Sequence, residues 1–590
     1  MSKKFVLATV FVALIVVAGF AFFSSANAVR TPDEWPVDVK KCYDCHALVK
    51  DFHTRGAHKD INCNNCHSGL ATHMKDVTKR PLSNTDHEAC GKCHKEQHAS
   101  FMTHNYRKKP NFDKGDPKGR SPYWEVLMRP YAFEVSHAEP RGHKYMLIDH
   151  LLNDRAYGGR FQSKRGFQYA IDKTGVAPKA WDVLFDAYPE EDLKAPKKAF
   201  LERTAPAAVP VCLKCKTADD HLAWPYMGDP SPKTTDISRA GNPAFNAYKY
   251  LRNGLPCINC HDPHSAEPRI VRDAMIDALT RPEKDTLWHE GYPNKANFKV
   301  YGNKEGLGLR GHERKIAILD KYDSLLMCGQ CHVEYNCGLH FDYEKTKYGE
   351  KPVALDFATD RRTNHFPFIP IVRTVNKKIV EETLWNHTMK LKYFDFVHYV
   401  TGAKLWKAQH PELESYYNSP HAKAGAKCTD CHTAGKVKTN FGTVSGSGAG
   451  ARPDGGKVYS SHWHASPRDF NWQPCLNCHT DWTSHDAEYA AESVKLYGKQ
   501  QMRKAEIWLR ELVSRFQTAK DFGVDKNTLD EVRVLHEKSH MMWEWWTAEN
   551  SDGFHNIEMA KASLSRSIVY AWKGMDILNK AIAAKTAAKK

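Results

Sequence analysis

The sequence predicts a mainly α-helical fold with little β-structure and with long helices at its C-terminal end. Three observations lead to this prediction. Eight short cysteine motifs recur along the 590 residues, only 41% of the residues are apolar, and mean hydropathy is −0.61. After residue 486, apolar residues recur at helical spacing. A chain so lean in apolar residues is expected to organise its core around bound groups rather than around a sheet.

Seven of the eight motifs read C-x-x-C-H, and the eighth ends in lysine. C-x-x-C-H is the attachment sequence of c-type haem, in which two thioethers hold the porphyrin and the histidine binds the iron. Structural zinc or disulfides would not require a histidine directly after the second cysteine. The motifs use 16 of the 17 cysteines and comprise Cys42, Cys45 and His46; Cys63, Cys66 and His67; Cys90, Cys93 and His94; Cys212, Cys215 and Lys216; Cys257, Cys260 and His261; Cys328, Cys331 and His332; Cys428, Cys431 and His432; and Cys475, Cys478 and His479.

Lys216 marks one motif as chemically different from the others. An amine replaces the imidazole there, and its pKa must fall before it can bind iron. Seven ordinary haems and one unusual haem suggest seven electron carriers and one reaction centre, with an open position for substrate opposite the lysine. The alternative is that the eighth motif is a decayed haem site.

Residues 1–28 have the pattern of a secretory signal. Lys3 and Lys4 precede an apolar run from Phe5 to Phe23, and Ala26-Asn27-Ala28 resembles a cleavage site. An uncleaved membrane anchor is the alternative, because the apolar run is long. No later stretch is apolar enough to span a bilayer. We therefore expect a periplasmic protein, cleaved after Ala28 and soluble when mature.

The formal net charge is +16 and the isoelectric point is near 9.0. Such a surplus can indicate affinity for nucleic acid or for membranes. Eight haems would add roughly sixteen propionate carboxylates, which oppose it. We therefore expect no nucleic-acid partner.

The spacing of the motifs predicts three regions after the signal peptide. A three-haem domain covers residues 29–120, a five-haem catalytic domain covers residues 121–485, and long helices fill residues 486–590. The turn-rich stretch Asp113–Arg120 marks the first boundary. Strand signals are few, with candidates at Val353–Phe357 and Phe368–Val372.

The C-terminal helices are expected at Ala487–Phe522, Thr528–Trp546 and Asn556–Lys589. Asp486 and Asn527 are the expected N-caps, and Gly523 is the expected stop. Their aromatic faces could pack on the haem region, on another subunit or within the helices themselves. Before them, Gly442–Gly456 is expected to be a Gly/Ser-rich loop.

Seven six-coordinate haems would need seven further axial ligands. The chain has 32 histidines, of which 25 remain after the motifs are counted. Residue order alone does not pair them with haems. The candidates near motifs are His53, His58, His73, His87, His98, His104, His421, His462 and His464.

From Arg141 to the last motif, the chain resembles the pentahaem cytochrome c nitrite reductases. Its three additional N-terminal motifs make it similar to their octahaem relatives. The shared segments are Arg141-Gly142-His143 followed by Arg155, C-L-K-C-K at 212–216, C-G-Q-C-H-V-E-Y at 328–335 and K-A-Q-H-P-E at 407–412. These segments span about half of the chain. The first 120 residues match only by motif count and position.

The resemblance implies six-electron reduction of nitrite to ammonium at the Lys216 haem. It implies that Arg155, Tyr335 and His410 surround the open side of that haem. Arg155 would attract the anion, His410 would pass protons and Tyr335 would offer a phenolic donor. Hydroxylamine and sulfite are expected side substrates. A quinol-linked or soluble cytochrome would donate electrons through the N-terminal haems, and the chain would self-associate.

The resemblance further implies a calcium ion beside the active haem, because the family holds one there. Its ligands would be Glu334, the carbonyls of Tyr335 and Lys407, and Gln409, which are the oxygen donors that this cation prefers. A thioether bond between Tyr335 and Cys337 is also expected, with a free thiol as the alternative. His421 and His462 match distal-ligand positions, and His264 and His555 match less closely.

Two other functions remain open at this point. The chain could be a different multihaem enzyme, one that oxidises hydroxylamine or reduces tetrathionate. It could also be an electron conduit without catalytic activity, in which every haem is six-coordinate. A high-spin signal from one haem in eight would favour an enzyme.

Overall fold

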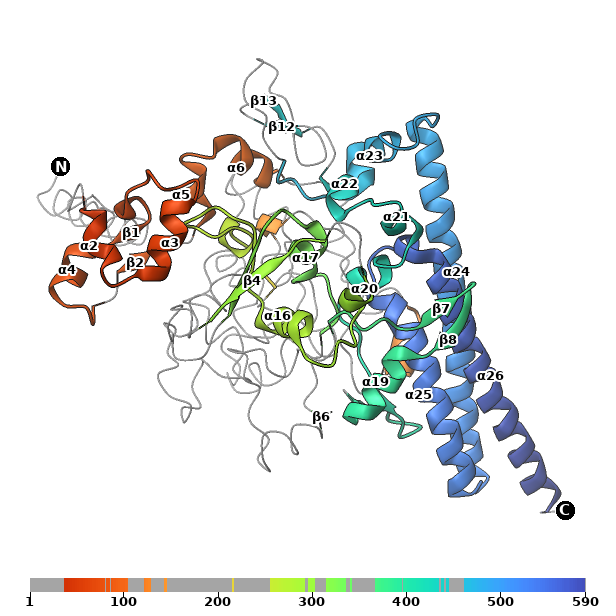
Figure 1. Ribbon diagram of the computed structural model, residues 1–590. Helices are drawn as coiled ribbons and strands as arrows, with labels where there is room; N and C mark the ends of the chain where they lie inside the picture. Colours follow the sequence, from red (N-terminus) through yellow and green to blue (C-terminus); the bar gives the residue numbers. More distant parts are fainter. Residues whose placement is uncertain are drawn as a thin grey trace, which may run out of the picture. The chain divides into compact units, whose positions relative to one another are not determined.

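The fold of the chain is seen in a computed structural model (Figure 1). It describes residues 37–79, 81–84, 86–103, 121–128, 143–145, 215–216, 255–291, 295–302, 315–335, 340–341, 367–394, 396–433, 437–439, 442–444 and 461–588. Helices dominate these residues and the strands are short, so the predicted fold class is confirmed. The signal segment 1–28, Val353–Phe357 and the boundary 113–120 lie outside the described residues.

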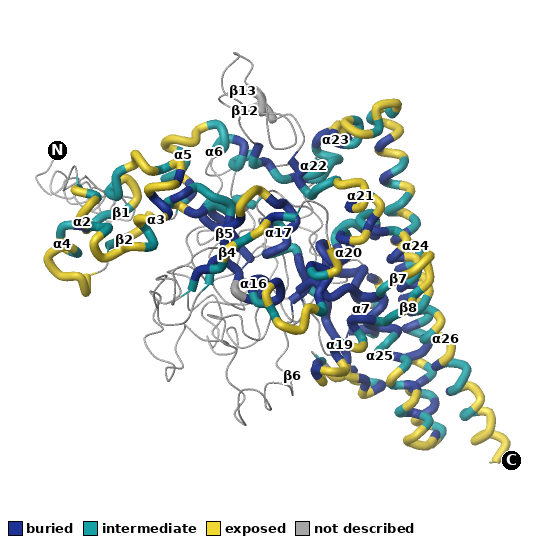
Figure 2. Tube along the Cα trace, in the orientation of Figure 1, coloured by how far each residue is buried: buried dark blue, intermediate teal, exposed yellow. Residues whose placement is uncertain are grey.

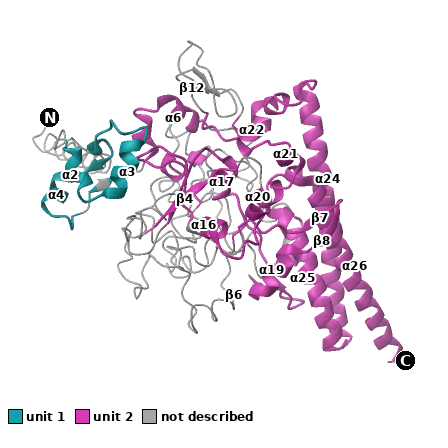
Figure 3. Cartoon of the chain, viewed as in Figure 1, with its two compact units in different colours: residues 1–85 teal, residues 86–590 magenta. Residues whose placement is uncertain are grey.

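The chain divides into two compact units, residues 1–85 and residues 86–590 (Figure 3). The third C-x-x-C-H motif, at Cys90, therefore belongs to the second unit. The predicted three-haem and five-haem regions, which meet at residue 120, group the haem motifs rather than the compact units of the fold. This division stays a prediction.

The first unit is built from short helices with little apolar core. Its buried apolar side chains in the described residues are Phe52 and Leu70. Asp38 caps the first helix by accepting a hydrogen bond from the Lys40 backbone N–H. The elements are α2 Val39–Tyr43, α3 Ala47–Arg55, η2 Cys63–Asn65, β1 His67–Ser68, α4 Leu70–Lys75 and β2 Leu82–Ser83, and the two strands pair antiparallel.

The second unit begins with short helices and small strands. Its three-stranded sheet, in the order β3-β5-β4, is antiparallel and has the fully buried run Ile316–Leu319 at its centre. The elements before the C-terminal helices are α5 His87–Gly91, α6 Lys95–Phe101, α7 Trp124–Met128, η4 His143–Tyr145, η7 Cys257–Asn259, β3 Arg269–Ile270, α16 Asp273–Thr280, η8 Leu287–Glu290, β4 Phe298–Tyr301, β5 Ile316–Leu319, α17 Ser324–Gly329, β6 His340–Phe341, β7 Arg373–Val375, β8 Lys378–Glu381, α19 Thr383–Leu391, β9 Tyr393–Phe394, β10 Phe396–Val397, β11 Lys404–Leu405, α20 Glu412–Tyr416, α21 Pro420–Lys423, α22 Cys428–His432, β12 Val437–Thr439, β13 Gly442–Val444, η9 Pro467–Phe470 and α23 Gln473–Leu476.

Two local predictions in this unit were wrong. Phe368–Val372 is irregular rather than a strand, and β7 begins one residue later at Arg373. Phe368 has a φ of 64°, and Pro370 carries no N–H to offer a neighbouring strand. The expected loop from Gly442 also starts with a strand, because β13 pairs antiparallel with β12.

Three long helices confirm the predicted C-terminal region. They are α24 Ser484–Asp521, α25 Lys526–Ala548 and α26 Ile557–Ala587, with η10 Phe554–Asn556 between the last two. α24 and α25 both pack along α26 (Figure 1). None of the helices in the described ranges is long and apolar enough to cross a membrane.

The predicted N-caps of α24 and α25 were each wrong by a few residues. Thr483 caps α24, and Asp486 instead closes a capping box by accepting from the Thr483 N–H. Asp525 caps α25 by accepting from the Thr528 N–H. Gly523 does follow the end of α24 with a φ of 72°, the left-handed conformation expected of a glycine stop.

The C-terminal part of α25, from Ser539 to Ala548, is buried and contains three tryptophans. The trace in Figure 2 is coloured by this burial. Trp543 donates to Glu506 of α24 at 3.3 Å, and Trp546 donates to Ser563 of α26. Trp545 donates to Ser415 of α20 at 2.8 Å. Each indole N–H therefore has a partner on a different element, so the helices and α20 form one packed body.

Burial of Glu506 makes the stability of this body depend on pH. Burial raises the pKa of Glu506 to about 7, although Arg503, Trp543 and Ser121 oppose the rise. The folded chain holds this proton more tightly than the unfolded chain. The protonated Glu506 side chain therefore makes its full contribution to the free energy of unfolding below about pH 4.5, and this contribution is lost as pH rises through about 7. We expect Glu506→Gln to lose less free energy of unfolding than wild type between about pH 5 and 8.

Denaturant unfolding at both pH values measures this difference. Glu488→Gln, an exposed position on the same helix, is the matched control and should follow wild type. An identical pH dependence of Glu506→Gln and wild type would contradict the expectation.

Candidate active site

The cysteine motifs share one backbone geometry. In six of them the second cysteine N–H donates to the first cysteine carbonyl at 3.1–3.3 Å. In five, the following histidine N–H donates to the same carbonyl at 2.9–3.0 Å. This helical turn places both thiols and the imidazole on one side of the backbone, since positions i, i+3 and i+4 share a helix face. The motifs therefore fit a porphyrin that is bound by two thioethers and one histidine.

The described cysteines form no disulfide, so their thiols remain available for thioethers. Several thiols from different motifs lie close enough to influence each other's pKa. In the first unit Cys42 contacts Cys63. In the second unit the pairs are Cys90 with Cys257, Cys215 with Cys331, and Cys328 with Cys428. Motifs that are distant in the sequence are therefore neighbours in space.

Lys216 is buried, and it lies close enough to the half-buried His143 to affect the pKa of that imidazole. Desolvation, together with the positive charges of His332 and Lys216, lowers the pKa of His143 to about 3. His143 is therefore neutral near pH 7, which is the form of imidazole that binds a metal. The sequence prediction did not select His143 as a ligand, although it lies in the Arg141-Gly142-His143 segment.

Arg272 connects the Lys216 motif to Tyr335. Its guanidinium donates to the Cys215 sulfur at 3.4 Å and lies 4.6 Å from the centre of the Tyr335 ring. Arg272 is buried, so these contacts keep a charge inside the protein. The sequence prediction missed this residue. Its surroundings in the sequence, with Arg269 before it and Asp273 directly after it, gave no signal for this role.

The Tyr335 segment also meets the loop that carries His410. Glu334 is buried, and its carboxylate accepts a hydrogen bond from the Gln409 N–H at 2.8 Å. The Tyr335 hydroxyl donates to the Gln330 carbonyl at 2.9 Å. The structure thus brings the segments of Lys216, Tyr335 and His410 together. Arg155, Cys212 and Cys337 lie outside the described residues.

The expected calcium ligands Glu334 and Gln409 are adjacent, and Lys407 lies two residues before Gln409. The Lys407 amine points elsewhere, to the buried carboxylate of Glu544 on α25 and to the Ala408 carbonyl at 2.8 Å. Among the described residues, no three His, Cys, Asp or Glu side chains form a metal-binding group. The expected calcium ligands would not form such a cluster, because they comprise one carboxylate and otherwise neutral oxygen atoms.

A second buried carboxylate fixes the same region. Glu414 accepts from the Phe368 N–H at 2.8 Å and from the Glu334 N–H at 3.2 Å. Burial raises the pKa of Glu414 to about 8. The Glu414 side chain therefore connects α20 to the segments that contain Phe368 and Glu334.

Five motif histidines each face one other histidine at a similar separation. An imidazole nitrogen binds a transition metal at about 2 Å, so two rings on opposite sides of one metal have centroids about 6 Å apart. The observed centroid separations are 6.2 Å for His46 and His73, 6.4 Å for His332 and His143, 6.3 Å for His261 and His462, 6.3 Å for His432 and His555, and 6.5 Å for His479 and His421. These separations fit a six-coordinate haem iron.

Other candidate histidines have different surroundings. His53 contacts the Tyr43 hydroxyl at 2.5 Å and the Ile61 carbonyl at 2.9 Å. His264 lies 3.7 Å from Asp262, and His87 contacts His98 at 2.8 Å.

Two further candidates complete the set. His464 is half-buried, with its ring 4.6 Å from that of His143. His104 lies outside the described residues.

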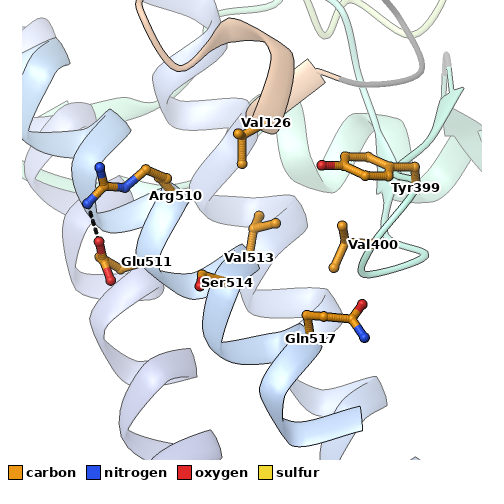
Figure 4. A pocket seen from close by; sticks show the side chains of 8 residues that line it. All are labelled: Val126, Tyr399, Val400, Arg510, Glu511, Val513, Ser514 and Gln517. Carbon is orange, nitrogen blue, oxygen red and sulfur yellow. Dashed lines mark hydrogen bonds and ion pairs between the residues drawn. The ribbon is translucent and has the colours of Figure 1, made fainter. Parts of the chain in front are cut away.

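A surface cavity of about 390 Å³ lies away from these residues (Figure 4). It is lined by Val126, by Tyr399 and by side chains of α24 that include Arg510 and Gln517. It contains no motif residue, so it is not the candidate site.

Comparison with known families now decides what the chain is. The family model described as cytochrome c552 matches residues 187–590. The chain belongs to the cytochrome c552 family. Covalently bound haem follows from this membership, and the matched region contains five of the eight motifs.

Two curated relatives are similar to this family member over much of its length. The cytochrome c nitrite reductase subunit NrfA of Nitratidesulfovibrio vulgaris is 26% identical over 495 residues, which is 80% of this chain and 73% of the relative. Cytochrome c-552 of Bacteroides thetaiotaomicron is 21% identical over 63% of this chain. The alignment covers 59% of that relative, less than two thirds of its length.

A solved structure shares the fold. The catalytic subunit NrfA of the Desulfovibrio desulfuricans cytochrome c nitrite reductase superposes with a TM-score of 0.51 at 22% identity. The match covers 85% of this chain and 87% of that subunit. The mainly helical NrfA-like fold with long C-terminal helices is therefore established for this chain.

The buried pair of Lys407 and Glu544 should stabilise the loop that carries His410. Removing one partner of a buried ion pair leaves an uncompensated charge, which costs about 3–5 kcal/mol. We expect Lys407→Met to lower the free energy of unfolding by about this amount in denaturant titration.

The double variant Lys407→Met/Glu544→Met should recover most of the loss, because it buries no charge at this position. Lys390→Met, an exposed substitution on α19, is the control. A double variant no more stable than Lys407→Met would contradict the buried-charge explanation.

Proposed function

We propose that this member of the cytochrome c552 family is an octahaem nitrite reductase that reduces nitrite to ammonium. One observation carries the proposal. A buried lysine replaces the usual motif histidine, and Arg272 and Glu334 join its segment to those of Tyr335 and His410. The similarity to a relative named as a nitrite reductase subunit supports the same reaction.

Haem bound at Cys212 and Cys215 would supply electrons and an open coordination position opposite Lys216. Lys216 is buried, so its amine lies inside the protein where it could bind the iron of this haem. Arg155 would attract nitrite with a permanent charge and a planar set of donors. His410 would hold and pass protons near neutral pH, and Tyr335 would donate a hydrogen bond.

The histidine pairs support six-coordinate haems as the electron carriers. From these ring separations, the second histidine that would hold each haem iron is His73 for the His46 motif, His143 for the His332 motif, His462 for the His261 motif, His555 for the His432 motif and His421 for the His479 motif. The contact between Cys90 and Cys257 would place the third motif beside the five later ones. Electrons from a quinol-linked or soluble cytochrome donor would enter through the N-terminal haems.

The proposal includes calcium at Glu334, Tyr335, Lys407 and Gln409, supported by the contact between Glu334 and Gln409. One ion there would fix both the Tyr335 and the His410 segments. It also includes export to the periplasm, self-association through the C-terminal helices, and side activity on hydroxylamine and sulfite.

A nitrite assay with reduced viologen tests the reaction. We expect the wild-type holoprotein to produce ammonium without releasing intermediates. We expect Lys216→His to lose at least about a hundredfold in kcat, because imidazole replaces the amine on the catalytic iron. Lys378→His, an exposed substitution on β8, should match wild type.

The absorption and EPR spectra of the same samples separate the possible outcomes. One high-spin haem among the low-spin haems is expected of the wild type. Uniformly low-spin haems together with absent nitrite turnover would contradict the proposal and indicate an electron conduit.

We further propose a thioether bond between Tyr335 and Cys337, the one cysteine outside the haem motifs. Bond formation would remove the thiol hydrogen and one ring hydrogen as two protons and two electrons, with ferric haem iron of the holoprotein as the electron acceptor, and would immobilise the phenol. Peptide mass spectrometry of the mature protein should find the peptide with both residues lighter by a pair of hydrogen atoms. A peptide of unmodified mass that reacts with a thiol reagent would rule the bond out.

A further inference from the structure

Glu549 is a buried carboxylate that faces a candidate axial ligand. It lies at the C-terminal end of α25 and is fully buried. Its carboxylate contacts the Nδ1 of His555 at 2.5 Å. The His555 ring lies 6.3 Å from that of His432, the histidine of the Cys428 motif. If His555 binds iron through Nε2, Glu549 holds the opposite nitrogen of the same ring.

The loop between α25 and α26 holds this pair in place. Glu549 accepts from the Ser551 N–H at 3.0 Å and from the Ser551 hydroxyl at 2.7 Å. The same hydroxyl accepts a hydrogen bond from the backbone N–H of His555 at 2.9 Å. A Cβ on Gly498 of α24 would lie 2.0 Å from the Asp552 carbonyl, so α24 packs directly against the loop. The contact between Glu549 and His555 is therefore built into the fold.

Four of the other paired histidines have neutral or more distant partners at Nδ1. His432 faces the Ala465 carbonyl at 2.9 Å, and His261 faces the Ala266 carbonyl at 3.2 Å. In the first unit His73 faces the Lys79 carbonyl at 3.0 Å. His332 does face a carboxylate, Glu412, but at 3.7 Å, which is too long for a hydrogen bond. Among these histidines, His555 has the closest anionic partner.

An anion at Nδ1 changes what the ligand does to its metal. The carboxylate pulls on the Nδ1 proton, so the ring becomes a stronger electron donor through Nε2. A fixed negative charge also favours the oxidised, more positive iron. We propose that Glu549 is a positioning residue that lowers the reduction potential of the haem at Cys428–His432. The inference rests on the proposed pairing of His432 with His555.

The position of this haem gives the lowered potential a role. Helix α22, which carries Cys428, packs against α17, which carries Cys328, and against α23, which carries Cys475, so the motif lies between two others. Electrons moving between those neighbours would have to pass a haem that is biased toward the oxidised state. Glu549 would therefore restrict the exchange of electrons between the Cys475 motif and the motifs nearer Lys216.

Redox titration of the holoprotein, followed by absorption and EPR, tests this inference. Glu549→Gln keeps the shape and hydrogen-bonding oxygen but removes the charge. We expect it to shift one midpoint potential upward and to alter the EPR signal of one low-spin haem. Glu537→Gln, which removes a carboxylate on α25 that accepts from the Lys404 N–H, should leave all potentials unchanged. Unchanged potentials in Glu549→Gln would overturn the inference.

A second variant keeps the test decisive if Glu549→Gln does not accumulate. Ser551→Ala removes a hydrogen bond that the Ser551 hydroxyl donates to the Glu549 carboxylate. More of the negative charge would then act on His555, so the midpoint potential of this haem should shift downward. An unchanged or raised potential would count against the inference. His555→Ala tests the pairing separately, because loss of a low-spin signal identifies His555 as a ligand. If all low-spin signals persist in His555→Ala, the proposed pairing itself is wrong.

Discussion

The helical turn within each cysteine motif is the constraint on which the rest of the structure depends. One carbonyl, that of the first cysteine, accepts from both the second cysteine and the following histidine in most described motifs. This shared acceptor sets the direction of three side chains over five residues. The short helices and irregular connections of the second unit place these turns next to each other. Regular sheet is small there because the positions of the turns, rather than strand pairing, determine the packing.

Charged groups inside the second unit connect these turns to one another. Arg272 lies between the Cys215 motif and Tyr335, while Glu334 and Glu414 join the segments around the predicted catalytic loop. Lys407 and Glu544 carry the same connection to α25. Buried charges without such partners would destabilise the fold, so each of these side chains must lie next to its partner in the folded chain. The catalytic segments and the C-terminal helices are thereby parts of one network.

The sequence predicted the parts of this structure that depend on local pattern. Helical periodicity located all three long helices, and motif spacing located every described haem turn. The N-caps of α24 and α25 were misplaced because Thr483 and Asp525 compete with neighbouring polar residues for the same role. The pairing of histidines could not be predicted, since His432 and His555 are far apart in sequence and meet only through packing. Arg272 was missed for the same reason.

The burial of Cys215 and Lys216 has a consequence for how the protein is made. A porphyrin cannot enter a closed interior, so this motif must receive its haem while the surrounding chain is still open. Helix α25 is anchored to α20 through Trp545 and Ser415, and it is synthesised after all eight motifs. The order of synthesis therefore favours haem attachment first and packing of the C-terminal helices last.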